Sequence, residues 1–175
     1  MNVHINPVSN TRYSGKNRIA LEVFMKKRNF SVPKWITFYQ AKQLGRKIKK
    51  GEHLIELGSG DGRATRYAVK ELGVRGKGID VNPFLVRWSN FLAKRQKLSG
   101  IEFVKENVFK SDLSEADLLY LFLMPEMLEE LRPKFEKELK KGTQIISHGF
   151  KIPGLEQKLV KTLTNKPFST YYYKL

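Results

Sequence analysis

The sequence predicts an α/β fold in which a doubly wound, mostly parallel sheet ends in an antiparallel pair of strands. Short apolar segments alternate with amphipathic segments long enough for helices, which is the pattern of parallel strands joined by helical crossovers. Residues 117–123 are almost continuously apolar, as expected for a strand covered on both faces. The last two predicted strands are joined by the turn Thr164-Asn165-Lys166-Pro167, which is too short for a crossover, so they should pair antiparallel.

Each predicted helix has a local reason. The predicted helices cover residues 17–28, 35–49, 64–72, 83–98 and 125–140. Val32-Pro33 separates the first two, and Pro83 is favourable in the first turn of the fourth. Pro133 lies inside the last helix and predicts an interruption there.

The strands are set apart from these helices by their short length and by the glycines and turns that flank them. The predicted strands cover residues 53–57, 76–81, 101–105, 117–123, 143–150, 158–163 and 170–175.

Composition places the chain among single-domain globular proteins. Of its 175 residues 41% are hydrophobic and 11% aromatic, enough to bury one core and too many for a disordered tail. The lack of repeats and of a Gly/Ser linker predicts one domain over residues 30–175, preceded by a basic extension over residues 1–29. The chain has no cysteine, which excludes disulfides, thiolate metal sites and a cysteine nucleophile. We predict no metal site.

Positive charge is concentrated toward the N-terminus. The net charge is +16, and residues 1–50 hold twelve Lys or Arg but only one acidic residue, Glu22. Three interpretations stay open: a solvated lysine-rich surface, a contact with a polyanion such as RNA or an RNA-bound protein, or a contact with an anionic membrane surface.

The apolar segments favour a cytoplasmic protein. The longest uncharged apolar stretch, residues 118–125, is far too short to cross a bilayer. Residues 1–7 lack the basic-then-apolar order of a secretory signal. We therefore expect no integral membrane segment and a cytoplasmic location.

A glycine-rich turn follows the first predicted strand. It reads Glu56-Leu57-Gly58-Ser59-Gly60-Asp61-Gly62-Arg63, and such glycines let a ligand approach the backbone closely. Because position 63 is Arg, the turn does not match the dinucleotide pattern, and no Lys-Ser/Thr pair makes it a phosphate loop. Glu56 and Asp61 would repel a pyrophosphate and suit a ligand with a cationic end.

Asp80 lies at the tip of the second predicted strand, twenty residues beyond Gly60. An aspartate at this position accepts hydrogen bonds from ribose hydroxyls in nucleotide-binding sheets of this class. The alternative is that Asp80 caps the helix beginning at Pro83. Behind the acidic turn the ribose interpretation is favoured, and the two features together describe a nucleoside with a positively charged amino-acid tail, such as S-adenosylmethionine.

The turn, Asp80 and the segment Asn107-Val108-Phe109 resemble the class I S-adenosylmethionine-dependent methyltransferases. Within that class, the chain is most similar to the small archaeal protein-lysine methyltransferases and their bacterial and mitochondrial relatives. Leu121-Phe122-Leu123-Met124-Pro125 and the segment 141–150, which contains Ser147-His148-Gly149-Phe150, carry this likeness. The resemblance implies a Rossmann-like seven-stranded sheet and S-adenosyl-L-methionine as methyl donor.

The resemblance also implies which residues bind the cofactor. The methionine part would be held by Glu56, Gly58, Ser59, Gly60 and Asp61. Asp80 would take the ribose, and Val81, Asn107 and Val108 would surround the adenine. Pro33 stands where relatives carry a Pro-Thr-Pro segment that closes over the cofactor, although the triplet here is Pro33-Lys34-Trp35.

The exit of the fourth predicted strand indicates the methyl acceptor. Methyltransferases acting on base amines commonly carry Asn/Asp-Pro-Pro-Tyr/Phe there, whereas this chain has Leu123-Met124-Pro125. Asn82-Pro83 imitates half of that motif but follows the second strand. An apolar exit suits lysine, because the attacking amine must be neutral and desolvation lowers its pKa. At pH 7, deprotonating a lysine of pKa ~10.4 costs about 4.6 kcal/mol.

Four residues are candidates for the acceptor site. Phe122, Met124 and Pro125 lie at the strand exit, with plain core packing as the alternative. His148 ends the fifth predicted strand at the same sheet edge, either as a proton acceptor or as a satisfied structural histidine. Tyr171-Tyr172-Tyr173 alternates on the last strand, where packing is favoured over lining a channel.

Protein-lysine N-methylation by in-line transfer to a desolvated amine is therefore the favoured function. The alternative is an RNA methyltransferase that grips phosphates with its basic N-terminal half, and a third interpretation is a cofactor-binding module without activity. Because a charge of +16 repels free lysine-rich targets, the expected partner is an acidic or ribosome-associated protein with an accessible lysine.

Overall fold

The computed structural model describes residues 48–164 and 168–175. The chain divides into two units, Met1–Val32 and Pro33–Leu175, and all the described residues belong to the second. Pro33 and the helices predicted over 17–28 and 35–49 lie outside the described residues, apart from Ile48 and Lys49, which are not helical.

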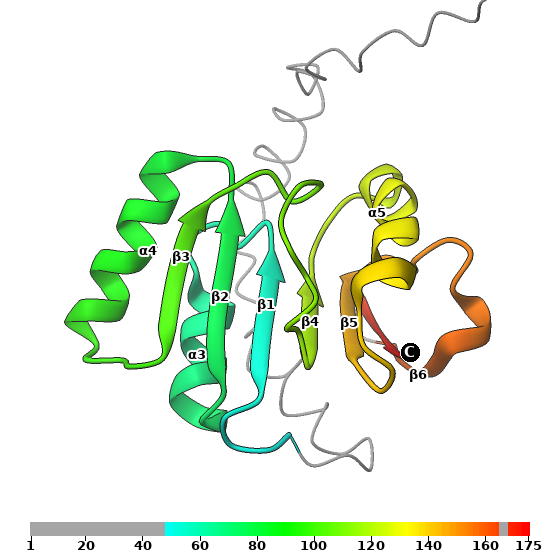
Figure 1. Ribbon diagram of the computed structural model, residues 1–175, viewed down its shortest axis with the longest axis horizontal. Helices are drawn as coiled ribbons and strands as arrows, with labels where there is room; N and C mark the ends of the chain where they lie inside the picture. Colours follow the sequence, from blue (N-terminus) through cyan, green and yellow to red (C-terminus); the bar gives the residue numbers. More distant parts are fainter. Residues whose placement is uncertain (1–47, 165–167) are drawn as a thin grey trace, which may run out of the picture. The chain divides into compact units, whose positions relative to one another are not determined.

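A seven-stranded sheet forms the centre of the described unit (Figure 1). Its strands are β1 His53–Leu57, β2 Arg75–Asp80, β3 Ile101–Lys105, β4 Leu118–Leu121, β5 Gln144–Gly149, β6 Leu159–Leu163 and β7 Ser169–Lys174. The spatial order is β3-β2-β1-β4-β5-β7-β6. Strands β1 to β5 pair in parallel, and β7 runs antiparallel between β5 and β6. The predicted Rossmann-like α/β class and its antiparallel ending are confirmed.

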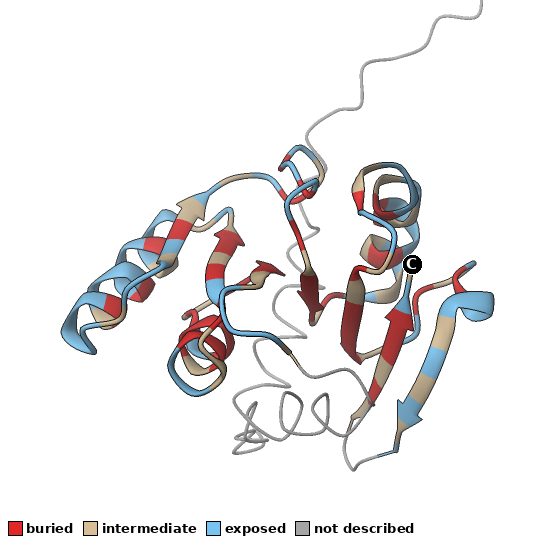
Figure 2. Ribbon diagram, turned by 60° about the horizontal axis from the view of Figure 1, so that its bottom comes forward, coloured by how far each residue is buried: buried red, intermediate tan, exposed pale blue. Residues whose placement is uncertain are grey.

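Helices of the described residues cover both faces of the sheet. They are α3 Arg63–Leu72, α4 Pro83–Arg95 and α5 Pro125–Glu138, with a short 3₁₀ turn, η1 Glu156–Lys158. The apolar side of α3 packs with Leu54 and Tyr120 on one face, whereas α5 packs with Ile55 and Leu119 on the other. α4 lies over Phe103 of β3, at the end of the sheet. Figure 2 shows the central strands buried between these layers.

The strand order places a switch point between β1 and β4. From β1 the chain moves outward through β2 and β3, and from β4 it moves the other way through β5. In sheets of this kind ligands bind beyond the carboxyl ends of the strands at such a point. The loop over residues 58–62 leaves β1 at this edge, which makes the edge the place to look for a site.

The predicted ends of the fourth strand and of the helix at Pro83, and the predicted break in the last helix, were wrong, and α4 ends at Arg95 rather than at residue 98. The fourth strand is Leu118–Leu121 rather than 117–123, because Phe122 and Leu123 leave the sheet before α5. α5 runs without interruption through Pro133. Leu128, Leu131 and Phe135 are fully buried on both sides of that proline, so packing holds the helix together where one backbone hydrogen bond is missing.

Among the described residues, no helix is both long and apolar enough to span a membrane.

Candidate cofactor and acceptor site

The loop over residues 58–62 folds back across the end of β2. The backbone N–H groups of Gly58 and Ser59 both donate to the carbonyl of Ile79, at 2.9 Å each. Gly62, with φ +69°, lies against the ring of Phe103, which a Cβ at that position would approach to 2.4 Å. The loop is therefore tied to the sheet along one side.

Gly60 sits at the outer part of this loop and is fixed at both of its backbone groups. Its N–H donates to Asp80 Oδ2 at 2.9 Å, and its carbonyl accepts from Ser89 Oγ at 3.1 Å. Its φ is +57°, and a Cβ placed on it would meet no atom of the described residues within 4 Å. The loop thus presents an open, side-chain-free surface in a rigidly held conformation.

Asp80 organises the tip of β2. Besides the bond from Gly60, its Oδ1 accepts from the backbone N–H of Asn82 at 2.8 Å. The cap of α4 is Asn82, whose Oδ1 accepts from Phe84 N at 3.0 Å, so the capping alternative for Asp80 is wrong. Each carboxylate oxygen has two lone pairs, so both can accept a further hydrogen bond.

Glu56 is buried beneath the loop rather than exposed on it. Its Oε2 accepts from the backbone N–H of Thr65 at 3.1 Å and from Thr65 Oγ1 at 2.5 Å. Thr65 belongs to the first turn of α3, where unpaired N–H groups and the helix dipole favour a negative charge. Glu56 therefore joins the end of β1 to the start of α3 and fixes the span of the loop.

Asp61 is paired with two arginines of α3. Arg63 Nε donates to Asp61 Oδ2 at 2.7 Å, and Arg66 Nη1 donates to the Asp61 carbonyl. The hydrogen bond with Asp61 raises the pKa of Arg63, whereas burial lowers the pKa of Arg66. The loop is consequently less acidic than its own sequence indicates.

The remaining predicted cofactor residues spread along the same edge. Val81 and Asn107 are exposed beyond the ends of β2 and β3, and Asn107 Oδ1 accepts from Phe109 N at 3.0 Å. Val108 is buried in the core between the sheet and α5. Ser59 is also buried, and its Oγ has no hydrogen-bond partner among the described residues. The structure brings these residues to one edge of the sheet, where Val81 and Asn107 are exposed and Ser59 and Val108 are buried.

An aromatic cluster lies beside this edge, at the exit of β4. It consists of Phe122, His148, Phe150 and Phe168. The ring centroid of Phe122 is 5.1 Å from His148 and 5.4 Å from Phe168, and Phe168 is 5.9 Å from His148. The segments that contribute these rings are far apart in sequence and meet only because β4, β5 and β7 are neighbours in the sheet.

His148 is held inside this cluster. The ring is buried, and its Nδ1 lies 2.9 Å from Thr170 Oγ1 on β7. Phe168 was missed by the sequence reasoning; its only signal is its position just before the last strand, next to Ser169, which pairs with Gly149.

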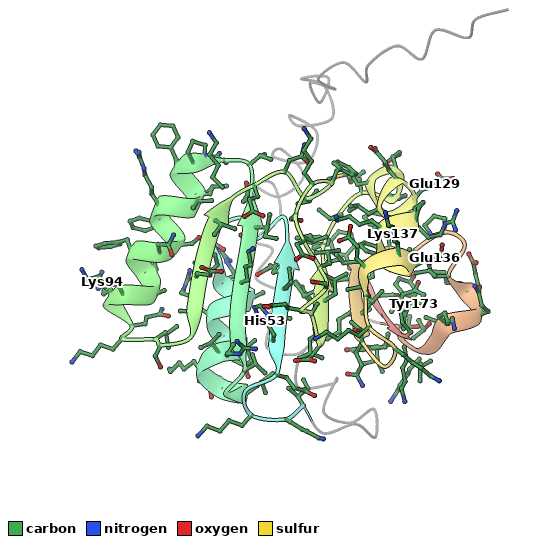
Figure 3. All side chains as sticks on the ribbon, in the orientation of Figure 1. His53, Lys94, Glu129, Glu136, Lys137 and Tyr173 are labelled. Carbon is green, nitrogen blue, oxygen red and sulfur yellow. The ribbon has the colours of Figure 1, made fainter. Side chains whose placement is uncertain are left out.

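Met124 and Pro125 follow shortly after Phe122 of the cluster, where α5 begins. Met124 is 36% exposed at the N-cap of α5, and Pro125 is the first helical residue. Three exposed glutamates follow on α5: Glu126, Glu129 and Glu130. Figure 3 labels Glu129 on this helix.

The tyrosines of β7 pack in the core, as predicted. Tyr172 is buried toward α3 and Tyr173 toward α5. The hydroxyl of Tyr173, which Figure 3 labels, accepts from the backbone N–H of Ile152 at 2.9 Å. Burial raises the pKa of both side chains.

Comparison with family models gives two matches. The ANTKMT methyltransferase domain matches residues 56–159, from Glu56 at the end of β1 to the start of β6. The N-terminal domain of anti-restriction factor ArdC matches residues 1–62, most of which lie outside the described part of the chain.

Curated relatives are lysine methyltransferases by name. A protein-lysine N-methyltransferase of Saccharolobus islandicus is 36% identical over 116 residues, which are 65% of this chain and 72% of the relative. The adenine nucleotide translocase lysine N-methyltransferase of Mus musculus is 31% identical over 102 residues, 57% of this chain and 44% of the relative. This chain thus spans less than half the length of the mouse relative.

Solved structures agree on the fold. An RNA methyltransferase of Salinibacter ruber in complex with S-adenosyl-L-homocysteine superimposes with a TM-score of 0.74 at 29% identity, over 82% of this chain and 92% of that chain. The ribosomal protein L11 methylase of Lactobacillus delbrueckii gives 0.64 at 19% identity, over 75% of each chain.

The model match covers more than half of the chain, and the archaeal relative agrees with it in sequence. The chain therefore belongs to the ANTKMT methyltransferase domain family and is a class I S-adenosylmethionine-dependent methyltransferase of the small lysine methyltransferase type.

Proposed function

We propose that this enzyme methylates the ε-amine of lysine in a protein, with the cofactor over loop 58–62 and the lysine entering alongside the aromatic cluster, past Met124. The single observation that carries the acceptor part is the exit of β4. It presents Phe122 and Met124, backed by His148 and Phe168, where an enzyme for base amines would present a polar side chain.

The residues at the sheet edge fit S-adenosylmethionine. Gly60 offers an open backbone surface on which a ligand can lie, and Asp80 can still accept from the two hydroxyls of a ribose. Glu56, below the loop, keeps that surface in register with α3. When bound, the cofactor supplies a methyl group on a positively charged sulfur. We assign the amino-acid end to the Asp61 side of the loop and the adenine to the side of Val81 and Asn107.

Cluster residues prepare the lysine amine for attack. A lysine is charged at pH 7, and a neutral amine is required, so its proton must leave before transfer. The rings of Phe122, Phe150 and Phe168 are partly buried and pack on one another, and a lysine side chain laid against their exposed sides is desolvated there. Desolvation lowers the pKa of a completely buried lysine by up to 3–5 units. This is as large as the ~3.4 units that separate an ordinary lysine pKa from pH 7. In this proposal His148 is a wall of the entrance, held in place by Thr170.

Local charge favours a cationic acceptor over a phosphate chain. Glu126, Glu129 and Glu130 lie on the first turns of α5, directly after Met124. Exposed carboxylates attract an approaching lysine and repel nucleic-acid phosphates. The first turns of α5 beside the proposed acceptor entrance are therefore acidic, although the net charge of the chain is positive.

RNA methylation is the second candidate, because the Salinibacter ruber protein that shares the fold at 29% identity is named an RNA methyltransferase. In that case residues 1–50, with their excess of Lys and Arg, would hold the RNA. In the favoured proposal the same residues dock an acidic or ribosome-associated protein. Residues 1–47 lie outside the described part of the chain, so both versions rest on sequence.

One labelling experiment separates the two functions. Cell extract is incubated with the enzyme and tritium-labelled S-adenosylmethionine, then divided between ribonuclease and protease. We expect the label to survive ribonuclease and disappear with protease, and mass spectrometry to place it on lysine. Gly60→Val, which is expected to abolish cofactor binding, serves as the inactive control. Label that is lost with ribonuclease and found on nucleotides would overturn the proposal.

A further inference from the structure

An apolar stripe runs along the outer face of α4. Phe84, Trp88 and Phe91 are 75%, 51% and 52% exposed, and Arg95 continues their line one turn further on. The spacing of four, three and four residues puts all four on one side of an α-helix. We call these four residues the outer stripe. In Figure 2 the outer side of α4 is largely exposed along its length.

Among the described residues, the outer stripe takes no part in the buried core. The opposite side of α4 carries Val86, Ser89 and Ala93, which are buried, with Val86 and Ala93 packed against Phe103. Trp88 and Phe91 stack on each other, with ring centroids 5.5 Å apart and planes 25° apart. The exposed rings therefore form a preformed ridge. Because the two rings are already stacked, little side-chain entropy is lost when the ridge binds a partner.

Only positive charge accompanies this ridge. α4 contains Arg87, Lys94 and Arg95 and no acidic residue, and all three basic side chains are exposed. Among the described residues, none of the three takes part in an ion pair. Figure 3 shows Lys94 on the outer side of the helix. Arg87 and Lys94 flank the aromatic line on one side, at the spacing of two helical turns.

We propose that the outer stripe of α4 docks on the surface of an anionic lipid bilayer. Helices that lie in a membrane interface combine Trp and Phe on one side with Lys and Arg beside them, which is the arrangement here. With 13 residues, α4 is too short to span a bilayer and long enough to lie on one.

A bilayer fits this surface better than single-stranded RNA does. Base stacking needs aromatic rings with free flat faces, whereas Trp88 and Phe91 already cover one face of each other. A lipid interface accepts rings at any angle, and its phosphates are within reach of Arg87 and Lys94. The contact also has a consequence for orientation, because α4 begins at the sheet edge that carries Asp80.

The test uses the full-length protein and liposome flotation. The vesicles are phosphatidylcholine alone or phosphatidylcholine with 30% phosphatidylserine, in 0.15 and 0.5 M salt. We expect binding to the anionic vesicles and at least a tenfold weaker partition for Trp88→Ser/Phe91→Ser. Arg87→Gln/Lys94→Gln should weaken the partition on anionic vesicles alone. Val160→Ser, which changes a 61% exposed valine on β6 at the other end of the sheet, is the matched control.

Trp88 fluorescence locates the contact, because the basic N-terminal half can also attract anionic vesicles. In a Trp35→Phe background, Trp88 is the only tryptophan, and brominated lipids should quench it. Flotation without quenching, or equal partition of the double serine variant, would overturn the proposal. RNA binding that falls in this variant while lipid binding does not would assign the stripe to RNA. A concentration-dependent Trp88 shift without vesicles would assign it to a second copy of the chain. Methyl transfer to a soluble acceptor should be unchanged by the substitutions on α4 and at Val160, each compared with the background in which it is made, so the test is independent of the proposed acceptor.

Discussion

At the scale of residues, Gly60 and Asp80 form one unit. The Asp80 carboxylate receives the Gly60 N–H at 2.9 Å, and the same carboxylate is the proposed ribose acceptor. Gly60 therefore helps to hold the carboxylate that would bind the ribose, and Asp80 helps to hold the loop backbone over which the ligand would lie. This dependence makes both residues informative targets, provided that effects on folding are separated from effects on binding.

Gly60→Val should abolish binding of S-adenosylmethionine. The side chain would enter the open space over the loop and would be strained at φ +57°. Gly142→Val is the matched control, because Gly142 also has a positive φ and, in the described part of the chain, no atom within 4 Å of its Cβ position, yet it lies away from the loop. Calorimetry should give normal binding for the Gly142 variant. Equal loss in both would mean that backbone strain, and not the ligand, explains the result.

Asp80→Ala should weaken cofactor binding at least tenfold. Two hydrogen bonds to a charged group are lost, and each is worth about 1.5–3 kcal/mol, while a tenfold change corresponds to about 1.4 kcal/mol. Asp112→Ala is the control, since Asp112 is an exposed aspartate that accepts from Ser114 N at 2.9 Å. Cofactor affinity unaffected by the Asp80 change would show that the ribose is bound elsewhere.

The variant His148→Gln tests whether His148 only lines the acceptor entrance or accepts a proton from the lysine. Glutamine can keep a hydrogen bond with Thr170 and fills part of the same space, so we expect the maximal rate to stay within tenfold and its pH profile to keep its shape. Loss of a general base would cost about 10²–10⁴-fold in rate. A loss of that size, together with a missing limb of the pH profile, would contradict the proposed role.

At the scale of elements, the switch point determines where the proposed site lies. Loop 58–62, the tip of β2 and the exit of β4 come together because the chain turns outward on both sides of β1 and β4. Glu56 then links β1 to α3, and Asn82 caps α4. The loop is thus held by the two helices that follow the first two strands.

Element boundaries were predictable where the sequence has a local cause. β1 and β3 are found over the predicted residues, and α4 starts at Pro83, as expected. The errors at Phe122 and Pro133 come from tertiary packing, which a local pattern does not contain. The pairing of Asp61 with Arg63 and Arg66 depends on the direction in which α3 leaves the loop. The position of Phe168 depends on how β7 pairs with β5. The sequence motifs therefore predict neither of them.

His53, the first residue of β1, should make folding stability depend on pH. Burial lowers its pKa in the folded protein, with Arg75 adding to the effect. As pH falls through about 6.5 the unfolded chain takes up a proton that the folded chain does not, so stability is lost toward acid and regained toward neutral pH. Urea unfolding between pH 7.5 and 5.5 should show a smaller slope for His53→Gln, by at most about 1.4 kcal/mol per pH unit. An unchanged slope would exclude this contribution.

At the scale of the whole molecule, charge and chemistry are separated. Most of the net charge of +16 lies in residues 1–50, whereas the acceptor edge beside α5 carries exposed glutamates. An enzyme built in this way can attract a polyanion or an acidic protein with one region and admit a lysine at another. The affinity for the target and the rate of transfer should then respond to different changes.

Deleting residues 1–29 should leave the methyltransferase core folded and impair docking. We expect the melting temperature and cofactor affinity to change little, and the KM for a protein acceptor to rise at low salt with little change in kcat. Raising the salt concentration should reduce the difference between the two forms, because screening weakens the same interaction. Unfolding of the shortened chain would show that these residues are part of the core.

The last strand also determines which end of the chain is convenient for handling. β7 runs antiparallel to β5 and β6. Next to the beginning of β5, the N–H of Gly142 donates to the carbonyl of Leu175, and the N–H of Leu175 donates to the carbonyl of Thr143. That is the far rim of the sheet from Gly60 and Asp80. An affinity tag or a surface tether attached after Leu175 should therefore leave the rim that carries the proposed site pointing toward the solution, which suits immobilised capture of substrates.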